Sequence, residues 1–327
     1  MSDIGLHKHL IGRQGSRLAL NTPVLVIDRD ALQRNIEAMA AFARTKGMAL
    51  RPHAKTHKSV DIAKLQLAAG AVGVCCAKLG EAEALAEGGV QNILITSPVV
   101  TPQAIERLIA LNGKIGQLRV VADSPDNVDA LASATKAAGK ALDVLVDIDP
   151  GIRRTGVATP EAAVALAQRI AAAETLRFAG VQYYCGAQQH IESFADRRAA
   201  IADRTDYLRR VIEALSRAGY APEVVTGGGT GTHRIDAELG VLTELQAGSY
   251  VFMDKQYNDC DLDGGGGKPF ETSLVVDAHV ISANSASMAT IDAGFKALST
   301  DGGLPVVMDG APAVAMFVFM GDEHGAL

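Results

Sequence analysis

The chain of 327 residues contains no tryptophan, and aromatic residues make up only 4% of it. No apolar run approaches the roughly 20 residues that span a membrane, and the N-terminal segment lacks the apolar core of a secretory signal. Basic residues form no stripe and the formal net charge is −6, which argues against nucleic acid as a partner. The four cysteines show no zinc-ligand spacing. These absences predict a cytoplasmic protein with reduced thiols, and neither membrane nor nucleic acid as a partner.

Short apolar runs alternate with alanine-rich amphipathic stretches almost from end to end. This alternation is typical of a parallel sheet covered by helices. Several expected helices begin with proline directly after a cap, as at Thr101-Pro102, Ser124-Pro125 and Thr159-Pro160. The expected helices include 30–46, 102–111, 125–138, 160–173 and 196–218. The expected strands are 23–28, 48–52, 72–77, 92–97, 118–123, 143–149, 178–184, 223–227 and 245–252.

These nine strands are one more than an eight-stranded barrel needs, and setting aside 23–28 leaves eight. We therefore predict a (β/α)8 TIM barrel over residues 29–255. Residues 1–28 and 256–327 are expected to form a β-rich second domain, because short apolar runs follow there without long helices. These runs are 272–282, 287–292, 305–308 and 314–320. A doubly wound open sheet is the alternative, although no G-x-G-x-x-G follows the first strand.

A basic segment, RPHAKTHK at residues 51–58, follows the first expected barrel strand. Active sites of TIM barrels lie at the C-terminal ends of the strands. Lys55 lies there between two imidazoles, which suits an amine that must be neutral to attack a carbonyl. The plain alternative is a solvated basic turn.

A glycine-rich segment, TGGGTG at residues 226–231, follows the seventh barrel strand. Consecutive glycines allow backbone N–H groups to turn toward one anion, and phosphate sites of barrels often follow strands seven and eight. A flexible turn is the alternative. A phosphate cradle and a reactive lysine in one barrel indicate pyridoxal 5'-phosphate, an aldehyde that carries a phosphate.

The chain resembles the fold type III pyridoxal-phosphate enzymes, which have an alanine-racemase-like barrel and a β-rich domain. Within them it is similar to the group of D-threonine aldolases, D-serine dehydratases and 3-hydroxy-D-aspartate aldolases. We expect a homodimer. The motifs that carry the resemblance are Thr22-Pro23 with Asp28, and residues 51–58, 73–76, 147–156, 226–231, 244–252, 292–294 and 322–325.

The resemblance implies roles for the residues around the cofactor. Lys55 would bond covalently to the cofactor aldehyde, and Arg154 would approach the phenolic oxygen of the cofactor. The alternative for Arg154 is a structural ion pair with Asp147 or Asp149. The phosphate is expected at Gly228, Gly229, Thr230, Gly248 and Ser249, with Tyr257 closing over it.

The same resemblance places residues around the cofactor ring and the substrate. Gln246 occupies the place where racemases of this fold set an arginine against the pyridine nitrogen, and Tyr184 competes for that role. His53, Lys78 and Tyr184 are expected on the substrate side. His53 or a metal-bound hydroxide would take the β-hydroxyl proton.

Two features depart from the group. Ala77 stands where relatives commonly have glutamine. The His-x-Asp or His-x-Cys motif that follows Glu-His-Gly in the group is absent, because the sequence given ends three residues after His324. The resemblance implies a divalent metal, Mn²⁺ or Mg²⁺. We expect its ligands beyond Leu327, in a longer form of the chain, and assign none within the sequence.

The resemblance implies a lyase that cleaves D-β-hydroxy-α-amino acids of the D-threonine type to glycine and an aldehyde. A 3-hydroxy-D-aspartate aldolase, which releases glyoxylate, is a close alternative, because residues 186–190 resemble that subgroup and His190 could meet a second carboxylate. A dehydratase that eliminates the hydroxyl group is a further alternative. A non-catalytic pyridoxal-phosphate-binding protein is the alternative of another class, and residues 256–327 count against it, because such proteins are generally a barrel alone.

Overall fold

The computed structural model describes residues 3–327, which fall into two compact units. The larger unit comprises Gln33–Val251 and Tyr257–Glu271, and the smaller unit comprises the residues up to Leu32 together with Phe252–Gln256 and Thr272–Leu327. Residues 257–271 therefore belong with the barrel, whereas the sequence assigned them to the second domain. Two contacts hold this segment there. The Tyr257 ring lies 4.4 Å from the His190 ring, and the amide of Asp261 donates to the Glu192 carbonyl at 3.0 Å.

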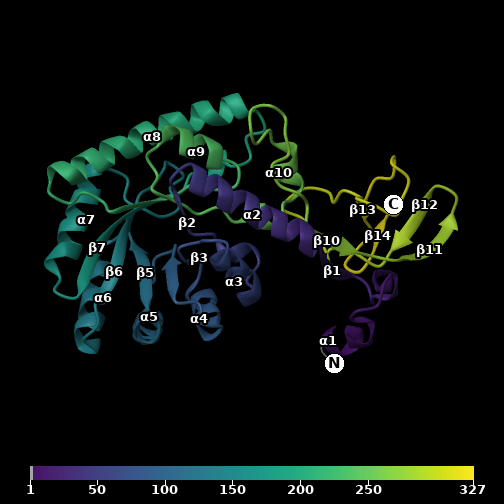
Figure 1. The fold of residues 1–327 in the computed structure, drawn as a ribbon, viewed down its shortest axis with the longest axis horizontal. Helices are drawn as coiled ribbons and strands as arrows, with labels where there is room; N and C mark the ends of the chain where they lie inside the picture. The colour runs from purple at the N-terminus through teal and green to yellow at the C-terminus, as the bar shows by residue number, and fades with distance from the viewer. Residues whose placement is uncertain (1–2) are drawn as a thin grey trace. The chain divides into compact units, whose positions relative to one another are not determined.

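The larger unit contains eight parallel strands in the order β2-β9-β8-β7-β6-β5-β4-β3 (Figure 1). A parallel bridge joins His53, just after β2, to Cys75 in β3, and this bridge closes the barrel. The predicted (β/α)8 barrel is confirmed. The strands are β2 (Ala49–Leu50), β3 (Val74–Cys76), β4 (Asn92–Ile95), β5 (Gln117–Ala122), β6 (Leu142–Asp147), β7 (Leu176–Tyr183), β8 (Val224–Gly227) and β9 (Glu244–Leu245).

Helices surround the strands of the barrel (Figure 1). The hydroxyl groups of Thr101 and Thr159 accept the N–H groups of Ala104 and Ala162, which fixes the starts of two helices that begin with proline. One buried residue from each of five successive strands forms an apolar layer inside the barrel: Cys75, Leu94, Val121, Leu145 and Ala179. The helices are α2 (Arg29–Thr45), α3 (Val60–Ala68), α4 (Leu79–Glu87), α5 (Pro102–Lys114), α6 (Pro125–Ala138), α7 (Pro160–Ala172), α8 (Phe194–Arg217) and α9 (His233–Leu239), followed by the short α10 (Lys255–Asp259).

The last barrel strand is shorter than the sequence predicts. The apolar run 245–252 forms a strand only in β9, and Ser249–Val251 form a 3₁₀ turn. A Cβ atom on Gly248 would lie 2.8 Å from Thr56 Oγ1 and 3.0 Å from the His53 carbonyl oxygen. Glycine therefore permits the chain to pass close to the segment that carries Lys55, and the strand ends there.

The smaller unit is rich in short strands. β1 (Val24–Ile27) pairs antiparallel with β10 (Leu274–Asp277), and a four-stranded sheet has the order β11-β12-β14-β13. The expected strand 272–282 is interrupted at 278–279 and its second half belongs to β11, while no strand forms at 305–308. Only Val318–Phe319 of the apolar run 314–320 pair with a neighbour. The sheet consists of β11 (Val280–Ser285), β12 (Met288–Ile291), β13 (Val318–Phe319) and β14 (Gly325–Ala326), and the N-terminal α1 (Asp3–His7) precedes β1.

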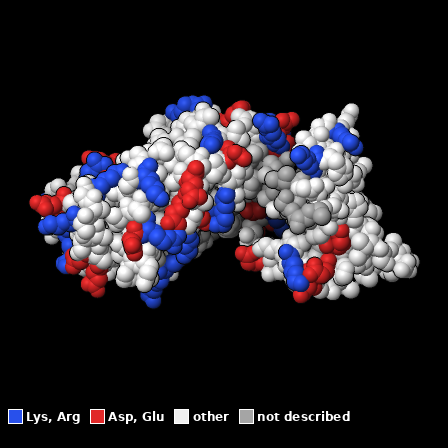
Figure 2. Space-filling model, turned by 90° about the horizontal axis from the view of Figure 1, so that it is seen from below, with Lys and Arg blue, Asp and Glu red and all other residues white. Residues whose placement is uncertain are grey.

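The surfaces of the two units differ in character. Lys and Arg side chains intersperse with Asp and Glu side chains on the face of the barrel drawn in Figure 2. The β-rich unit instead exposes large apolar side chains, among them Met308, Val314, Met316 and Met320. Apolar surface of this kind is typical of regions that contact another protein surface. Among the described residues, no helix is both long and apolar enough to cross a membrane.

Candidate active site

Lys55 lies at the C-terminal end of the first barrel strand, where barrels hold their active sites. It belongs to a 3₁₀ turn, Ala54–Thr56, that directly follows the bridge between His53 and Cys75. The amide of Lys55 donates to His53 Nδ1 at 3.3 Å, and the amide of His53 donates to the Ala247 carbonyl at 3.1 Å. These bonds fix the backbone of Lys55 to the segment that follows β9.

Three residues predicted from the sequence converge on one aromatic ring. Lys55 Nζ lies 5.4 Å from the centroid of the Tyr184 ring, and Arg154 Cζ lies 5.8 Å from it. Burial of the ammonium group lowers the pKa of Lys55, and the Arg154 guanidinium lowers it further. Solvent still reaches the Lys55 side chain. Burial raises the pKa of Tyr184, so its phenol stays protonated. The site thus favours a neutral amine beside a neutral phenol.

His53 is buried and both of its ring nitrogens have partners. Nδ1 accepts the amide of Lys55, so the proton of the neutral ring lies on Nε2, which faces Thr96 Oγ1 at 3.1 Å. Burial and the neighbouring cations lower the pKa of His53 to about 3. This arrangement supports His53 as a residue that positions Lys55. Its role as a general base stays a prediction.

Gln246 lies in a buried hydrogen-bond chain across the barrel. Its Nε2 donates to Thr226 Oγ1 at 3.0 Å and to Gln182 Oε1 at 3.3 Å. Gln182 Nε2 in turn donates to Asp147 Oδ1 at 2.9 Å and to the Thr96 carbonyl at 3.1 Å. Because a carbonyl can only accept, the Thr96 bond sets the direction of the whole chain. The oxygen of the Gln246 amide therefore remains as the group that a ligand in the barrel could meet.

The glycine-rich turn lies beside the 3₁₀ turn that ends the last strand. The amide of Tyr250 donates to Thr230 Oγ1 at 3.0 Å, which ties the two segments together. Within the described part of the chain, the backbone N–H groups of Gly228, Thr230, Gly248 and Ser249 donate to no protein atom. Three of these four residues are buried, and buried N–H groups without a partner are rare. Four free donors in two joined turns form a site suited to an anion such as phosphate.

Several predicted residues lie differently from the expectation. Among the described residues, Arg154 forms no ion pair with Asp147 or Asp149. Asp147 accepts from Thr155 Oγ1 and Gln182, and Asp149 accepts backbone N–H groups of residues 151–153, so the structural alternative for Arg154 is not observed. Lys78 is exposed directly before α4, and among the described residues the cations on the Tyr184 ring are Lys55 and Arg154 rather than Lys78.

Two further predictions concern the edge of the site and the metal. Tyr257 is buried against the ring of His190, which is itself exposed. Its expected place above a bound phosphate stays a prediction. Among residues 3–327, no group of three or more His, Cys, Asp and Glu side chains is arranged to hold a metal ion. His324 is exposed.

The sequence did not indicate the side chains that hydrogen-bond to the backbone of the glycine-rich turn. Gln189 Oε1 accepts the amide of Gly231 at 3.1 Å, and Thr232 Oγ1 accepts the amide of Gly229 at 3.2 Å. The Thr232 hydroxyl donates in turn to Asp236 at 2.6 Å. Nothing in the spacing of these residues indicates the network, because Gln189 comes from a different βα segment. Only the threonine next to the glycine run could have drawn attention to it.

Comparison with known proteins decides the family. The family model described as alanine racemase, N-terminal domain, matches residues 27–256, and a model described as a serine dehydratase domain matches residues 273–327. The chain belongs to the alanine racemase N-terminal domain family. This confirms the resemblance that the motifs predicted.

Among curated relatives, the chain is 42% identical over 315 residues to 3-hydroxy-D-aspartate aldolase of Paracoccus denitrificans (strain Pd 1222), covering 94% of this chain and 80% of that protein. It is 38% identical over 308 residues to D-threonine aldolase of an Arthrobacter species, with the same two coverages. Among solved structures, D-threonine aldolase from Filomicrobium marinum has a TM-score of 0.90 and 41% identity, covering 94% of this chain and 82% of that chain.

The family supports pyridoxal phosphate as the cofactor, and the residues of this site fit that group. Lys55 offers an amine whose pKa is lowered at the end of a barrel strand. The free amides of the two turns offer donors for a phosphate, and Gly228 and Gly229 are so closely packed that a Cβ atom would lie within 2.5 Å of a neighbouring oxygen. Backbone, rather than side chains, therefore lines this part of the site.

Proposed function

We propose that the chain is a pyridoxal-phosphate-dependent carbon–carbon lyase that converts D-β-hydroxy-α-amino acids to glycine and an aldehyde. One observation carries the proposal: Lys55 and Arg154 approach the same Tyr184 ring in a barrel that also presents four free backbone donors. Relatives that are 38% and 42% identical, named D-threonine aldolase and 3-hydroxy-D-aspartate aldolase, support it.

Each residue of this chain has a physical role in the proposal. When bound, pyridoxal phosphate supplies an aldehyde that bonds to amines and a conjugated ring that accepts the electron pair of a broken bond at the α-carbon. Arg154 lowers the pKa of Lys55 and so increases the neutral fraction of its amine. The Tyr184 phenol stays protonated and can donate a hydrogen bond, and Gln246 offers an amide oxygen. The amides of the two turns would hold the phosphate.

We also propose three finer points. A divalent metal, Mn²⁺ or Mg²⁺, would assist loss of the β-hydroxyl proton by lowering the pKa of that hydroxyl. The exposed apolar side chains of the β-rich unit support a homodimer. The four cysteines are free and buried, which supports a cytoplasmic location where thiols stay reduced.

The experiment supplies D-threonine and D-threo-3-hydroxyaspartate separately, with Mn²⁺ or with a chelator. It measures glycine, acetaldehyde, glyoxylate, ammonia and keto acid in each reaction. The proposal expects aldehyde and glycine in equal amounts, and less of both with chelator. Ammonia and keto acid as main products would instead identify a dehydratase, and cofactor binding without any turnover would support a non-catalytic protein.

A second substrate, 3-hydroxy-D-aspartate, is favoured by one feature of the site. His190 is exposed beside the buried Tyr257, so its imidazole is available to a second carboxylate. His190→Ala should then raise the KM for hydroxyaspartate and leave that for D-threonine unchanged. An equal change for both substrates would contradict this role of His190.

A further inference from the structure

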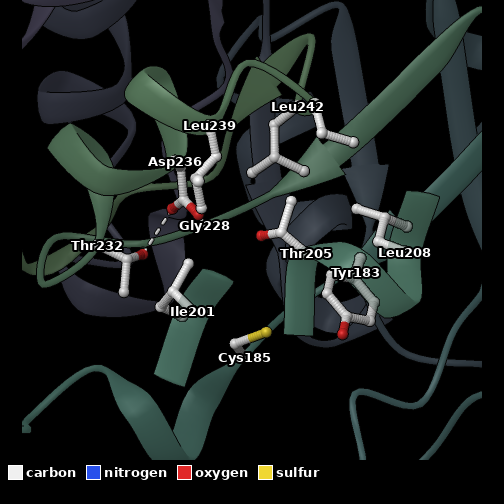
Figure 3. Close-up of a pocket in the computed structure, with 11 residues that line it drawn as sticks. Tyr183, Cys185, Ile201, Thr205, Leu208, Gly228, Thr232, Asp236, Leu239 and Leu242 are labelled. Carbon is white, nitrogen blue, oxygen red and sulfur yellow. Dashed lines mark hydrogen bonds between the residues drawn. The ribbon is translucent and has the colours of Figure 1, made fainter. Parts of the chain in front are cut away.

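A buried carboxylate lies behind the glycine-rich turn and takes no part in the proposed chemistry. Asp236 belongs to α9, and Figure 3 shows it between Thr232 and Gly228. A Cβ atom on Gly228 would lie 2.5 Å from Asp236 Oδ2, so the carboxylate directly contacts the turn. The carboxylate is therefore close enough to influence a phosphate bound on the other side of that turn.

Asp236 reaches the turn through a hydroxyl group whose hydrogen-bonding capacity is fully used. Thr232 Oγ1 donates to Asp236 Oδ2 at 2.6 Å and accepts from the amide of Gly229 at 3.2 Å and from Gln189 Nε2 at 3.1 Å. Gln189 Oε1 accepts the amide of Gly231 at 3.1 Å. Alternate amides, those of Gly229 and Gly231, are thus held from behind, while those of Gly228 and Thr230 are left free.

Among the described residues, no cation pairs with Asp236. The carboxylate borders a cavity of about 10 Å³, which holds roughly one water molecule (Figure 3). The titratable groups that line this cavity from the other elements are the Tyr183 phenol and the Cys185 thiol. α8 contributes only the neutral Ile201, Thr205 and Leu208, and the segment after α9 contributes Val241 and Leu242.

His233, on the same helix, is kept neutral by burial, which lowers its pKa to about 4, and it contacts the Thr230 carbonyl through Nδ1. For Asp236, burial raises the pKa to about 7 against the opposing effect of the Thr232 hydrogen bond. The carboxyl group therefore changes charge near neutral pH, and its Oδ2 can accept from Thr232 in either state, because a proton can reside on Oδ1.

We propose that Asp236 is a positioning residue that couples phosphate binding at the turn to uptake of a proton. Neutral Asp236 holds the turn through Thr232 and Gln189 without opposing an anion. Ionised Asp236 holds the same turn but repels a phosphate dianion across it, so binding and ionisation disfavour each other. The inference rests on the proposed function, in which the phosphate of pyridoxal phosphate occupies this turn.

The test compares two ligands that differ only in the phosphate. Apo-protein is titrated with pyridoxal 5'-phosphate and with pyridoxal between about pH 6 and about pH 8.5, and the ratio of the two affinities is taken at each pH. For the wild type the ratio should fall as pH rises, by about tenfold for each pKa unit by which the phosphate raises the pKa of Asp236. Asp236→Asn, which stays neutral, should not show this fall, so its ratio should exceed that of the wild type increasingly as the pH rises. The ionisation of the phosphate itself is common to both proteins and cancels in the comparison.

Three further variants separate position from charge. Thr232→Val removes the hydroxyl that connects Asp236 to the turn, and it should weaken binding of pyridoxal phosphate much more than that of pyridoxal. Thr232→Ser should restore the affinity. Thr205→Val is the matched control, because Thr205 borders the same cavity but, among the described residues, forms no hydrogen bond with the turn, whose amides bond Thr232 and Gln189 instead.

Identical pH profiles for wild type and Asp236→Asn would overturn the inference, as would equal losses for both ligands. If Asp236→Asn does not fold, calorimetry of the wild type in buffers of different ionisation enthalpy decides instead. The protein should then take up more protons when pyridoxal phosphate binds than when pyridoxal binds, and equal proton uptake with both ligands would refute the coupling. If the wild type binds neither ligand through Lys55, the proposed function fails before this inference is reached.

Discussion

Replacing Gly228 by alanine should damage both the fold and the cofactor site. Gly228 has a φ of +69°, in the left-handed region that residues with a Cβ atom avoid. Its Cβ atom would also lie 2.5 Å from Asp236 Oδ2 and 3.1 Å from Leu245 Cδ2. The new side chain would therefore enter the packed wall of the barrel, so a loss of stability should accompany the loss of cofactor binding.

The expected loss of stability in Gly228→Ala has two parts, a backbone cost and a packing cost, and Gly139 provides a control for the backbone cost. A left-handed backbone costs about 1–2 kcal/mol for a residue with a Cβ atom, and overpacking of a buried site costs about 1–3 kcal/mol more. Gly139, at the end of α6, has the same φ of +69° but no atom within 4 Å of its Cβ position. Gly139→Ala should therefore show only the backbone cost, about 1–2 kcal/mol. Gly228→Ala should lose roughly 2–5 kcal/mol in total.

Urea unfolding of the two apo-proteins measures the free energies, and titration with pyridoxal phosphate measures binding by the folded fraction. Equal destabilisation by Gly228→Ala and Gly139→Ala would refute the packing argument. If Gly228→Ala is destabilised but its folded fraction binds the cofactor as tightly as the wild type, the turn is not the phosphate site. The double variant Gly228→Ala/Asp236→Ala should lose less stability than the sum of the two single-variant losses, because Asp236→Ala removes the atom with which the new Cβ clashes.

Three other outcomes are expected. Lys55→Ala should abolish the visible absorbance of lysine-bound cofactor and the mass adduct left after borohydride reduction, whereas Lys58→Ala, which removes the ion pair with Glu81, should keep both. Arg154→Met should raise the pKa of Lys55, so the pH at which apo-protein captures the cofactor should move upward, and an unchanged profile would contradict this role. Burial lowers the pKa of His233 from 6.5 to about 4, so the unfolded chain binds a proton in that window and stability falls as the pH drops through it. His233→Asn should reduce this acid destabilisation by on the order of 3 kcal/mol, measured by urea unfolding at several pH values.

The barrel could be predicted from sequence because its signals are local. The proline after Thr101 and the one after Thr159 mark helix starts that the structure places at the same residues. The β-rich unit was harder, because apolar character at 305–308 predicts burial or pairing and the structure gives neither. A short strand forms only where a neighbour offers its backbone, as β14 does for Phe319, and sequence does not specify that neighbour.

The site divides in the same way. Lys55, Arg154 and Tyr184 were predicted from motifs and approach one another in the structure. The residues that support Gln246 and the glycine-rich turn, such as Gln182 and Thr232, were not predicted. Their roles depend on hydrogen bonds between segments far apart in the chain, as between Gln189 and Thr232, which are 43 positions apart. A glutamine or threonine has the same local pattern whether or not such a bond exists.

The charged groups of the site affect the protonation of Lys55 and leave Arg154 without a paired carboxylate. Burial lowers the pKa of Lys55 and the nearby Arg154 cation lowers it further, and no described carboxylate forms an ion pair with Arg154. Asp147 is close enough to be influenced by the Arg154 charge, but it is bonded to Gln182 and Thr155, and burial raises its pKa to about 6. A guanidinium without a fixed counter-ion stays available for an anionic ligand. Binding of an anion should therefore be electrostatically favourable at this site. A phosphorylated cofactor and a substrate with a carboxylate would supply the negative charge that no protein side chain supplies to Arg154.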